Sequence, residues 1–161
     1  MTWRGTTTIQ DRILASLPYL LPLMYGVQFG NSILTMFPAL AAVLYPLIAP
    51  VAFIYSLVPF AGIIVFFALL LLIVRNERIS HFIRFNTMQA LLITIVLFLC
   101  QIATSILSNL GSSIAPLLLV LNNTIFLAVL IALGYTIIQT IRGHYADKIP
   151  KLSDAVYLQV Q

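Results

Sequence analysis

The side chains that could transfer protons or hold a metal are few, and none lies inside a long apolar stretch. General acid–base catalysis needs carboxylates or imidazoles that meet in one site, and a metal needs several such ligands together. The sequence therefore predicts no catalytic residue, no metal site and no cofactor, and the protein is not expected to be an enzyme. The acidic residues and histidines of the chain are Asp11, Glu77, His81, His144, Asp147 and Asp154.

The composition is that of a membrane protein. Of the 161 residues, 61% are apolar and 7% are charged, whereas an average soluble domain is about a quarter charged. So few polar residues cannot cover a surface in water. The 8 basic residues give a net charge of +4, but they form short clusters rather than a basic face. This distribution favours contact with membrane lipid and argues against nucleic acid as a partner.

Four apolar segments are long enough to cross a bilayer, which takes about 20 helical residues. We therefore predict an all-α integral membrane protein built as a four-transmembrane-helix bundle. Its membrane domain covers residues 13–141, between an N-terminal tail of residues 1–12 and a C-terminal tail of residues 142–161. The predicted spans are residues 13–29, 51–74, 85–107 and 115–141.

The segment between the first two spans, residues 31–50, is uncharged but contains Pro38, Pro46 and Pro50. Because proline removes a backbone donor and disfavours a regular helix, we predict a proline-broken segment that is interfacial or re-entrant. The sequence leaves open whether this segment crosses the membrane. If it does not, all basic clusters lie on one side, which the positive-inside rule makes the cytoplasmic or equivalent side. Both termini then lie on that side.

The loop between the second and third predicted spans carries the central basic cluster. Arg75, Arg78 and Arg84 can extend to lipid phosphates at the membrane surface, so we expect them to contact headgroups and to set the topology. Ser80 is placed to cap the helix that follows. The loop is short, which predicts an antiparallel helical hairpin.

Polar residues recur at helical spacing in the third predicted span, and two asparagines stand near the start of the fourth. Polar groups in hydrocarbon cost free energy unless they are paired, so such residues mark interior surfaces or interfaces. We expect them to face a path through the membrane or a partner subunit. These candidate residues are Gln101, Thr104, Ser105, Asn122 and Asn123.

Two patterns of small residues predict close helix packing. Thr124, Ala128, Ala132 and Thr136 recur every fourth position on one helix face, and small residues allow helices to approach closely in lipid. We assign this face to helix packing rather than to a pore lining. The segment 26–30 has a GxxxG spacing, but it lies at the end of a span, so a tight turn is an equal alternative.

Several longer runs closely resemble the twenty-kilodalton Tic subunit family of the chloroplast inner-envelope protein import translocon, which has cyanobacterial members. The resemblance covers about residues 11–92. The longest and most unusual run is Arg84-Phe85-Asn86-Thr87-Met88-Gln89-Ala90, and it is accompanied by Pro59-Phe60-Ala61-Gly62 and Gly26-Val27-Gln28-Phe29-Gly30.

The resemblance implies a four-helix membrane protein that takes part in protein transport across the inner envelope or the cyanobacterial plasma membrane. Its partners would be other translocon membrane subunits, unfolded preprotein and further copies of itself. No transit peptide precedes the first span, so we expect a cyanobacterial or plastid-encoded member. The chain departs from the family where members often carry acidic residues, because it has Tyr25 and Thr94 at those positions.

Three functional classes remain open. The first is a component of a preprotein translocation machinery that contributes to the protein-conducting path with partners or as an oligomer. The second is a structural or assembly subunit of a membrane protein complex. The third is a small-solute channel, which needs a continuous polar lumen.

Overall fold

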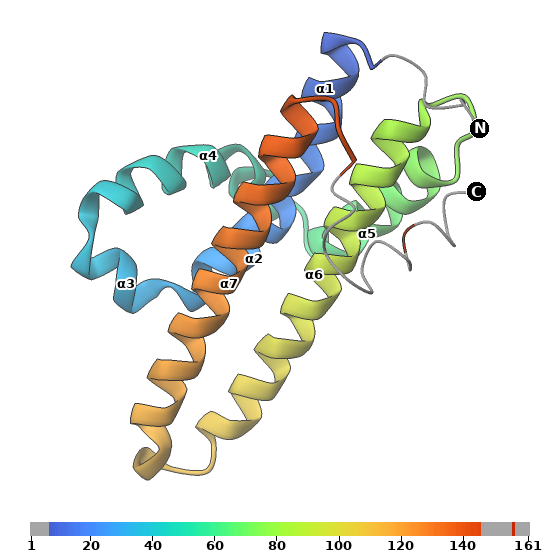
Figure 1. The fold of residues 1–161 in the computed structure, drawn as a ribbon. Coiled ribbons are helices and arrows are strands. Elements are labelled where there is room, and N and C mark those ends of the chain that lie inside the picture. The colour runs from blue at the N-terminus through green and yellow to red at the C-terminus, as the bar shows by residue number, and fades with distance from the viewer. Residues whose placement is uncertain (1–6, 146–155, 157–161) are drawn as a thin grey trace.

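The computed structural model describes residues 7–145 and residue 156. Every regular element over this part of the chain is a helix, and the helices form an elongated bundle with a side arm (Figure 1). Two short 3₁₀ turns, η1 and η3, and a π-helical segment, η2, connect or extend the α-helices. The elements are α1 Ile9–Ser16, η1 Leu17–Tyr19, α2 Leu20–Phe29, α3 Asn31–Met36, α4 Pro38–Leu57, α5 Ala61–Ala68, η2 Leu69–Val74, α6 His81–Ser108, η3 Ser112–Ile114 and α7 Ala115–Ile141.

The first predicted span is a rod of three consecutive elements, α1, η1 and α2. A capping box opens it: Asp11 N donates to Thr8 Oγ1 at 3.2 Å, and Thr8 N donates to Asp11 Oδ2 at 3.0 Å. Pro18 lies in the tight turn η1 and Pro22 in the first turn of α2, where the missing N–H groups do not end the rod.

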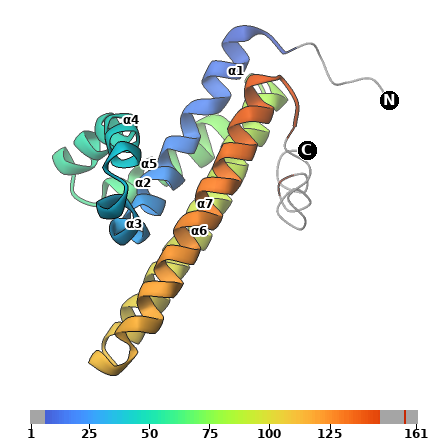
Figure 2. The same cartoon turned by 60° about the vertical axis from the view of Figure 1, so that its left-hand side comes forward.

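The proline-rich segment is more helical than its sequence suggests. Pro38 starts α4, where its missing N–H would be unpaired in any case, and Pro46 and Pro50 lie inside that helix. Helices tolerate prolines in lipid because no water competes for the remaining backbone groups. The helix α4 lies to the side of the bundle and follows a different direction from α6 and α7 (Figures 1 and 2).

The predicted second span, residues 51–74, is not one continuous helix in the structure. Residues 51–57 belong to α4, and the chain breaks at Phe60, which has the left-handed φ of 59°. The element that leads to the basic loop is the shorter apolar stretch Ala61–Val74, formed by α5 and η2. Ser80 then caps α6, as predicted, by accepting a hydrogen bond from Ile83 N at 3.5 Å.

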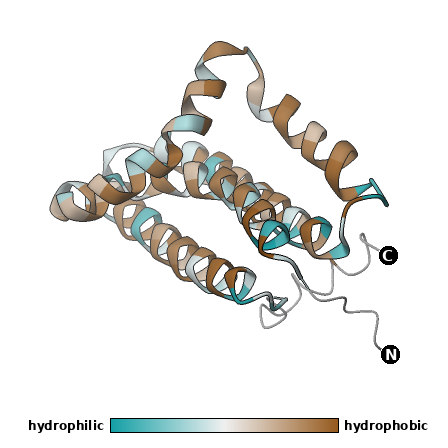
Figure 3. Ribbon diagram, turned by 90° about the horizontal axis from the view of Figure 1, so that it is seen from above, coloured by the Kyte–Doolittle hydropathy of each residue, from teal (hydrophilic) through white to brown (hydrophobic). Residues whose placement is uncertain are grey.

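The helices α6 and α7 run in opposite directions along the long axis of the bundle and are joined at the far end by η3, while α2 packs against both (Figures 1 and 2). With α4, they are the helices of the described chain that are long and apolar enough to cross a membrane: Pro38–Leu57, His81–Ser108 and Ser112–Ile141. Apolar residues predominate along the helices, and many large ones are exposed (Figure 3). This exterior suits hydrocarbon rather than water.

The core lies where α2, α6 and α7 meet. Phe126 of α7 and Ala90 of α6 are fully buried there. Gly26 and Gly30 of α2 face α7 so closely that an added Cβ would lie 2.8 Å from Val129 Cγ1 and 2.5 Å from Phe126 Cδ2. The GxxxG segment is therefore a helix contact, and Gly30 also ends α2.

Candidate functional site

The run Arg84–Ala90 forms the first turns of α6, and most of it is buried in the bundle. The amide of Asn86 is the centre of a polar cluster in this region. Its Nδ2 donates to Phe82 O at 2.8 Å, and its Oδ1 accepts a 2.7 Å hydrogen bond from Thr140 Oγ1 of α7. The hydroxyl of Tyr19, from η1, lies 2.9 Å from the same oxygen. Three elements that are far apart in sequence thus meet at one side chain.

The second amide of the cluster belongs to Gln89, whose Oε1 lies 2.9 Å from Tyr19 Oη. A phenol carries one proton and can donate one hydrogen bond. The hydroxyl of Thr140 also lies 2.8 Å from Thr136 O of its own helix. The hydroxyl protons of Tyr19 and Thr140 are therefore shared among three acceptors, Asn86 Oδ1, Gln89 Oε1 and Thr136 O.

This polar cluster is closed to solvent and carries no charge. Asn86, Gln89 and Thr140 are 0% exposed and Tyr19 is 1% exposed. Interhelical hydrogen bonds in membrane proteins contribute about 0.6–2 kcal/mol each, and an unpaired amide in hydrocarbon is costly. The cluster therefore holds the helices together by hydrogen bonds. It is not suited to proton transfer or to ligand exchange.

The arginines of the predicted headgroup cluster have different surroundings. Arg84 is half-buried, and its Nε donates to Val74 O at 2.8 Å, which caps the π-helical end of the preceding segment. Arg75 and Arg78 are exposed in the loop. The side chain of Arg84 therefore joins the two arms of the hairpin, and headgroup contact by Arg75 and Arg78 stays a prediction.

The described basic clusters meet at one end of the bundle. Arg12 Nη1 of α1 donates to Ile141 O at the end of α7 at 3.3 Å. Ser80 Oγ, after the basic loop, donates to Asp11 Oδ1 at 3.2 Å. The start of α1, the basic loop and the end of α7 are thereby neighbours (Figure 1). The remaining basic residues, Arg4, Lys148 and Lys151, lie outside the described residues.

The predicted polar stripe faces α2 at one point and the outside elsewhere. Gln101 Nε2 donates to Gln28 Oε1 at 2.9 Å, which ties α6 to α2. Thr104 Oγ1 donates to Cys100 O at 3.0 Å, and Ser105 is exposed. These contacts leave Thr104 bonded within its own helix, so the stripe is not one continuous interface inside the chain.

The asparagines of α7 are half-buried, and their Oδ1 atoms are buried without a hydrogen-bond partner among the described residues. Tyr55 Oη and Thr87 Oγ1 are also buried without a hydrogen-bond partner among the described residues. An unpaired buried acceptor costs about 1–3 kcal/mol, so Asn122 and Asn123 are the polar groups of α7 with most to gain from a further donor.

Most of the small-residue face of α7 is not buried against other helices of the chain. Thr136 is buried, Ala132 is half-buried, and Thr124 and Ala128 are exposed. The face that packs within the chain is the neighbouring one, which contains Phe126, Val129, Leu133, Thr136 and Thr140. Helix packing by the small-residue face against another chain stays a prediction.

The positions at which the chain departs from the acidic pattern of the resembled family lie together. Tyr25 of α2 and Thr94 of α6 line one cavity of about 210 Å³, with Gly62 and Phe66 of α5. Thr94 Oγ1 donates to Ala90 O at 2.8 Å within its own helix. In this chain the cavity is uncharged and mainly apolar.

Sequence reasoning identified the Arg84–Ala90 run by resemblance and did not identify what it contacts. It missed Tyr19 and Thr140 as partners of Asn86, and Arg12 as a cap for α7. The polar character of Tyr19 and Thr140 inside apolar segments was a signal, but no spacing rule links residues that lie 67 and 54 positions from Asn86.

Comparison with known proteins identifies relatives over nearly the whole chain. Residues 8–156 match the family described as "Chloroplast import apparatus Tic20-like". The chain is 37% identical over 161 residues to a Tic20 family protein of Synechocystis sp., which covers 100% of this chain and 99% of that protein. It is 37% identical over 158 residues to the Tic20 family protein Ycf60 of Gracilaria tenuistipitata var. liui, covering 95% of this chain and 76% of the relative. It is 28% identical over 150 residues to Protein TIC 20-v, chloroplastic, of Arabidopsis thaliana, covering 93% and 71%.

Proposed function

Because the chain belongs to the Tic20 family of the chloroplast import apparatus, we propose that it is a membrane component of a preprotein translocation machinery. It contributes to the protein-conducting path together with partner subunits or with further copies of itself. The chain is an integral membrane protein of the plasma membrane or the inner envelope, in keeping with its relatives and its apolar helices. The family is not known as a family of enzymes.

The main observation in support of this proposal concerns the run Arg84–Ala90, by which the chain resembles the family. This run lies where η1, α6 and α7 meet. Asn86 and Gln89 hold α6 to η1 and α7, so the residues that mark the family are those that maintain its bundle. The described parts of the basic clusters share one end of this bundle. We assign that end, and with it both termini, to the cytoplasmic or stromal side.

A conducting path would lie on the outer surface of this bundle. The junction of the helices is filled by side chains such as Tyr19, Phe85 and Phe126, each at most 1% exposed. Polar side chains lie instead along the far halves of α6 and α7, at the exposed Ser105 and at the half-buried Asn122 and Asn123. A polypeptide in transit would therefore pass between this surface and a partner.

The second candidate function is a structural or assembly subunit of a membrane complex. It is favoured by the exposure of Thr124 and Ala128, because a face of small residues on an exposed helix suits docking onto another helix. A small-solute channel formed by one chain is disfavoured by the filled junction.

Site-specific photocrosslinking in the native membrane distinguishes these functions. Probes are placed at Gln101 on the polar stripe and at Ala132 on the small-residue face, and the buried Leu97, 2% exposed, is the control position. Translocation predicts crosslinks from Gln101 to varied polypeptides that disappear when protein synthesis stops. Crosslinks from both positions to one or two stable membrane proteins alone would instead establish the assembly role.

A further inference from the structure

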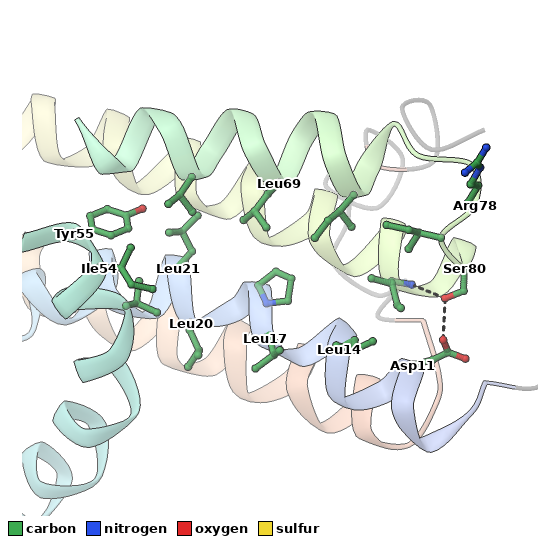
Figure 4. A pocket seen from close by; sticks show the side chains of 16 residues that line it. Asp11, Leu14, Leu17, Leu20, Leu21, Ile54, Tyr55, Leu69, Arg78 and Ser80 are labelled. Atoms are coloured by element: carbon green, nitrogen blue, oxygen red, sulfur yellow. Dashed lines mark hydrogen bonds between the residues drawn. The ribbon is translucent and has the colours of Figure 1, made fainter. Parts of the chain in front are cut away.

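A cavity of about 590 Å³ separates the first rod of the chain from the hairpin that carries the basic loop (Figure 4). The elements α1 and η2 both pack against α6, and the space between them is the cavity. The side of the first rod contributes Leu14, Leu17 and Leu21, and the side of the hairpin contributes Leu69 and Ile73. Ile54 and Tyr55 of α4 close the end that lies away from the basic loop.

The walls of this cavity suit a hydrocarbon chain. Leu14 is 50% exposed, Leu17 is 53% exposed and Ile54 is 50% exposed, although each lies beside other apolar side chains. Apolar walls give water few hydrogen bonds, so filling the space with hydrocarbon is favourable. The apolar molecule that a membrane supplies at high concentration is a lipid acyl chain.

The opposite end of the cavity is polar and charged. Ser80 and Asp11 meet there, and Arg78 stands at the same mouth (Figure 4). The carboxylate of Asp11 already accepts hydrogen bonds from Thr8 and Ser80. Within the described chain the exposed Arg78 side chain has no ion-pair partner, and Arg75 lies nearby in sequence. Arg78 is therefore the group at this mouth that can bind an anionic ligand, beside an Asp11 carboxylate that is held by Thr8 and Ser80.

We propose that this cavity binds one acyl chain of an anionic phospholipid whose phosphate lies at Arg78. The polar mouth and the apolar interior have the order of a lipid's headgroup and tail, and the mouth lies at the end where the basic clusters meet. A guanidinium forms charge-assisted hydrogen bonds with phosphate oxygens. The bound lipid completes the contact between α1 and η2, and this holds whether or not the chain conducts polypeptides.

Native mass spectrometry of the full chain released from nanodiscs tests this proposal. The nanodiscs contain equal amounts of phosphatidylglycerol and phosphatidylcholine with the same acyl chains. We expect one phosphatidylglycerol to stay bound per chain. Leu17→Trp fills the cavity and should reduce this retention several-fold, whereas Leu119→Trp, at a side chain of α7 that is 51% exposed, should leave it unchanged.

The headgroup contact has its own pair of variants. Arg78→Gln should lower the preference for phosphatidylglycerol about fivefold, since one basic residue near an anionic surface contributes about that factor. Arg142→Gln removes an exposed arginine outside the cavity lining and should preserve the preference. Circular dichroism checks that each variant keeps its helix content.

Two results would overturn the proposal. Equal retention in the Leu17→Trp variant and the unaltered chain would exclude the cavity as the binding site. Equal retention of the two lipids by the unaltered chain would exclude selection of an anionic headgroup by Arg78.

Discussion

Thr140 Oγ1 of α7 donates a 2.7 Å hydrogen bond to Asn86 Oδ1 of α6, and both side chains are completely buried. With the hydroxyl of Tyr19 at 2.9 Å from the same oxygen, this contact joins η1, α6 and α7 at one amide. The run Arg84–Ala90 therefore lies at a structural junction of the bundle.

Replacing the central amide should loosen the bundle. Asn86→Leu removes the amide oxygen that accepts from Thr140 and the Nδ2 group that donates to Phe82 O, so we expect a loss of about 1–3 kcal/mol in the free energy of unfolding. Reversible unfolding in mixed micelles measures it. Asn109→Leu, at an exposed asparagine after α6, is the control and should cost less. Equal stability of the two variants would contradict a locking role for the cluster.

Arg84 should act through its hydrogen bond as well as through its charge. Arg84→Lys keeps the positive charge but loses the Nε–H that bonds to Val74 O, so we expect lower stability by about 1.5–3 kcal/mol with unchanged topology. Arg84→Glu also reverses the charge and should disturb insertion. Protease accessibility of both termini reports topology. Arg75→Lys, in the exposed loop, is the matched control, and an equal effect there would disprove the capping role.

The glycine contact between α2 and α7 should not accept a methyl group. A Cβ at residue 30 would lie 2.5 Å from Phe126 Cδ2, so Gly30→Ala should cost about 1–3 kcal/mol through overpacking. Gly134→Ala introduces the same change where no atom lies within 4 Å and should be neutral or stabilising. Thermal unfolding compares the two, and a neutral Gly30→Ala would refute this close approach.

The small-residue face of α7 should govern association with other chains. Ala132→Leu, and more cleanly Ala128→Leu at an exposed position, should weaken a complex without unfolding the bundle, because a larger side chain separates the helix backbones. Complex size on native gels measures the effect. The control is Leu127→Ile, at an adjacent exposed position outside this face, and it should leave the size of the complex unchanged. If the size of the complex is the same in Ala128→Leu, in Ala132→Leu and in the unaltered chain, this face is not an interface.

The start of α1 should lose stability in acid. Hydrogen bonds from the Thr8 side chain and backbone are the main reason that the pKa of Asp11 lies below its ordinary value of 3.8. A carboxyl group with a lowered pKa in the folded state stabilises the fold above its unfolded pKa, and this contribution is lost as pH falls through the folded pKa. Asp11→Asn should therefore lower the melting temperature at neutral pH and have little effect once the pH is below the folded pKa of Asp11. A difference that is independent of pH would contradict this linkage.

A helical membrane protein could be predicted from the sequence without knowing which residues are in contact. Composition and the length of the apolar stretches indicated helices in a membrane, because hydrocarbon requires each segment to satisfy its own backbone hydrogen bonds. The third and fourth predicted spans, residues 85–107 and 115–141, agree closely with α6 and α7. The prediction of a proline-broken segment, which used proline propensities measured in water, was wrong for α4. This helix continues through Pro46 and Pro50.

Other features depended on the tertiary structure. The sequence shows Tyr19, Asn86 and Thr140 as isolated polar residues in apolar segments, and it identifies Arg84 as a charge near a surface. Which of them pair depends on how the helices cross and rotate, and the pairing distances span 54 to 70 residues. A hydropathy pattern records which residues avoid water, but inside lipid nearly every face of a helix does so. The packing partner of each face was therefore decided by shape and by hydrogen bonding between the folded helices.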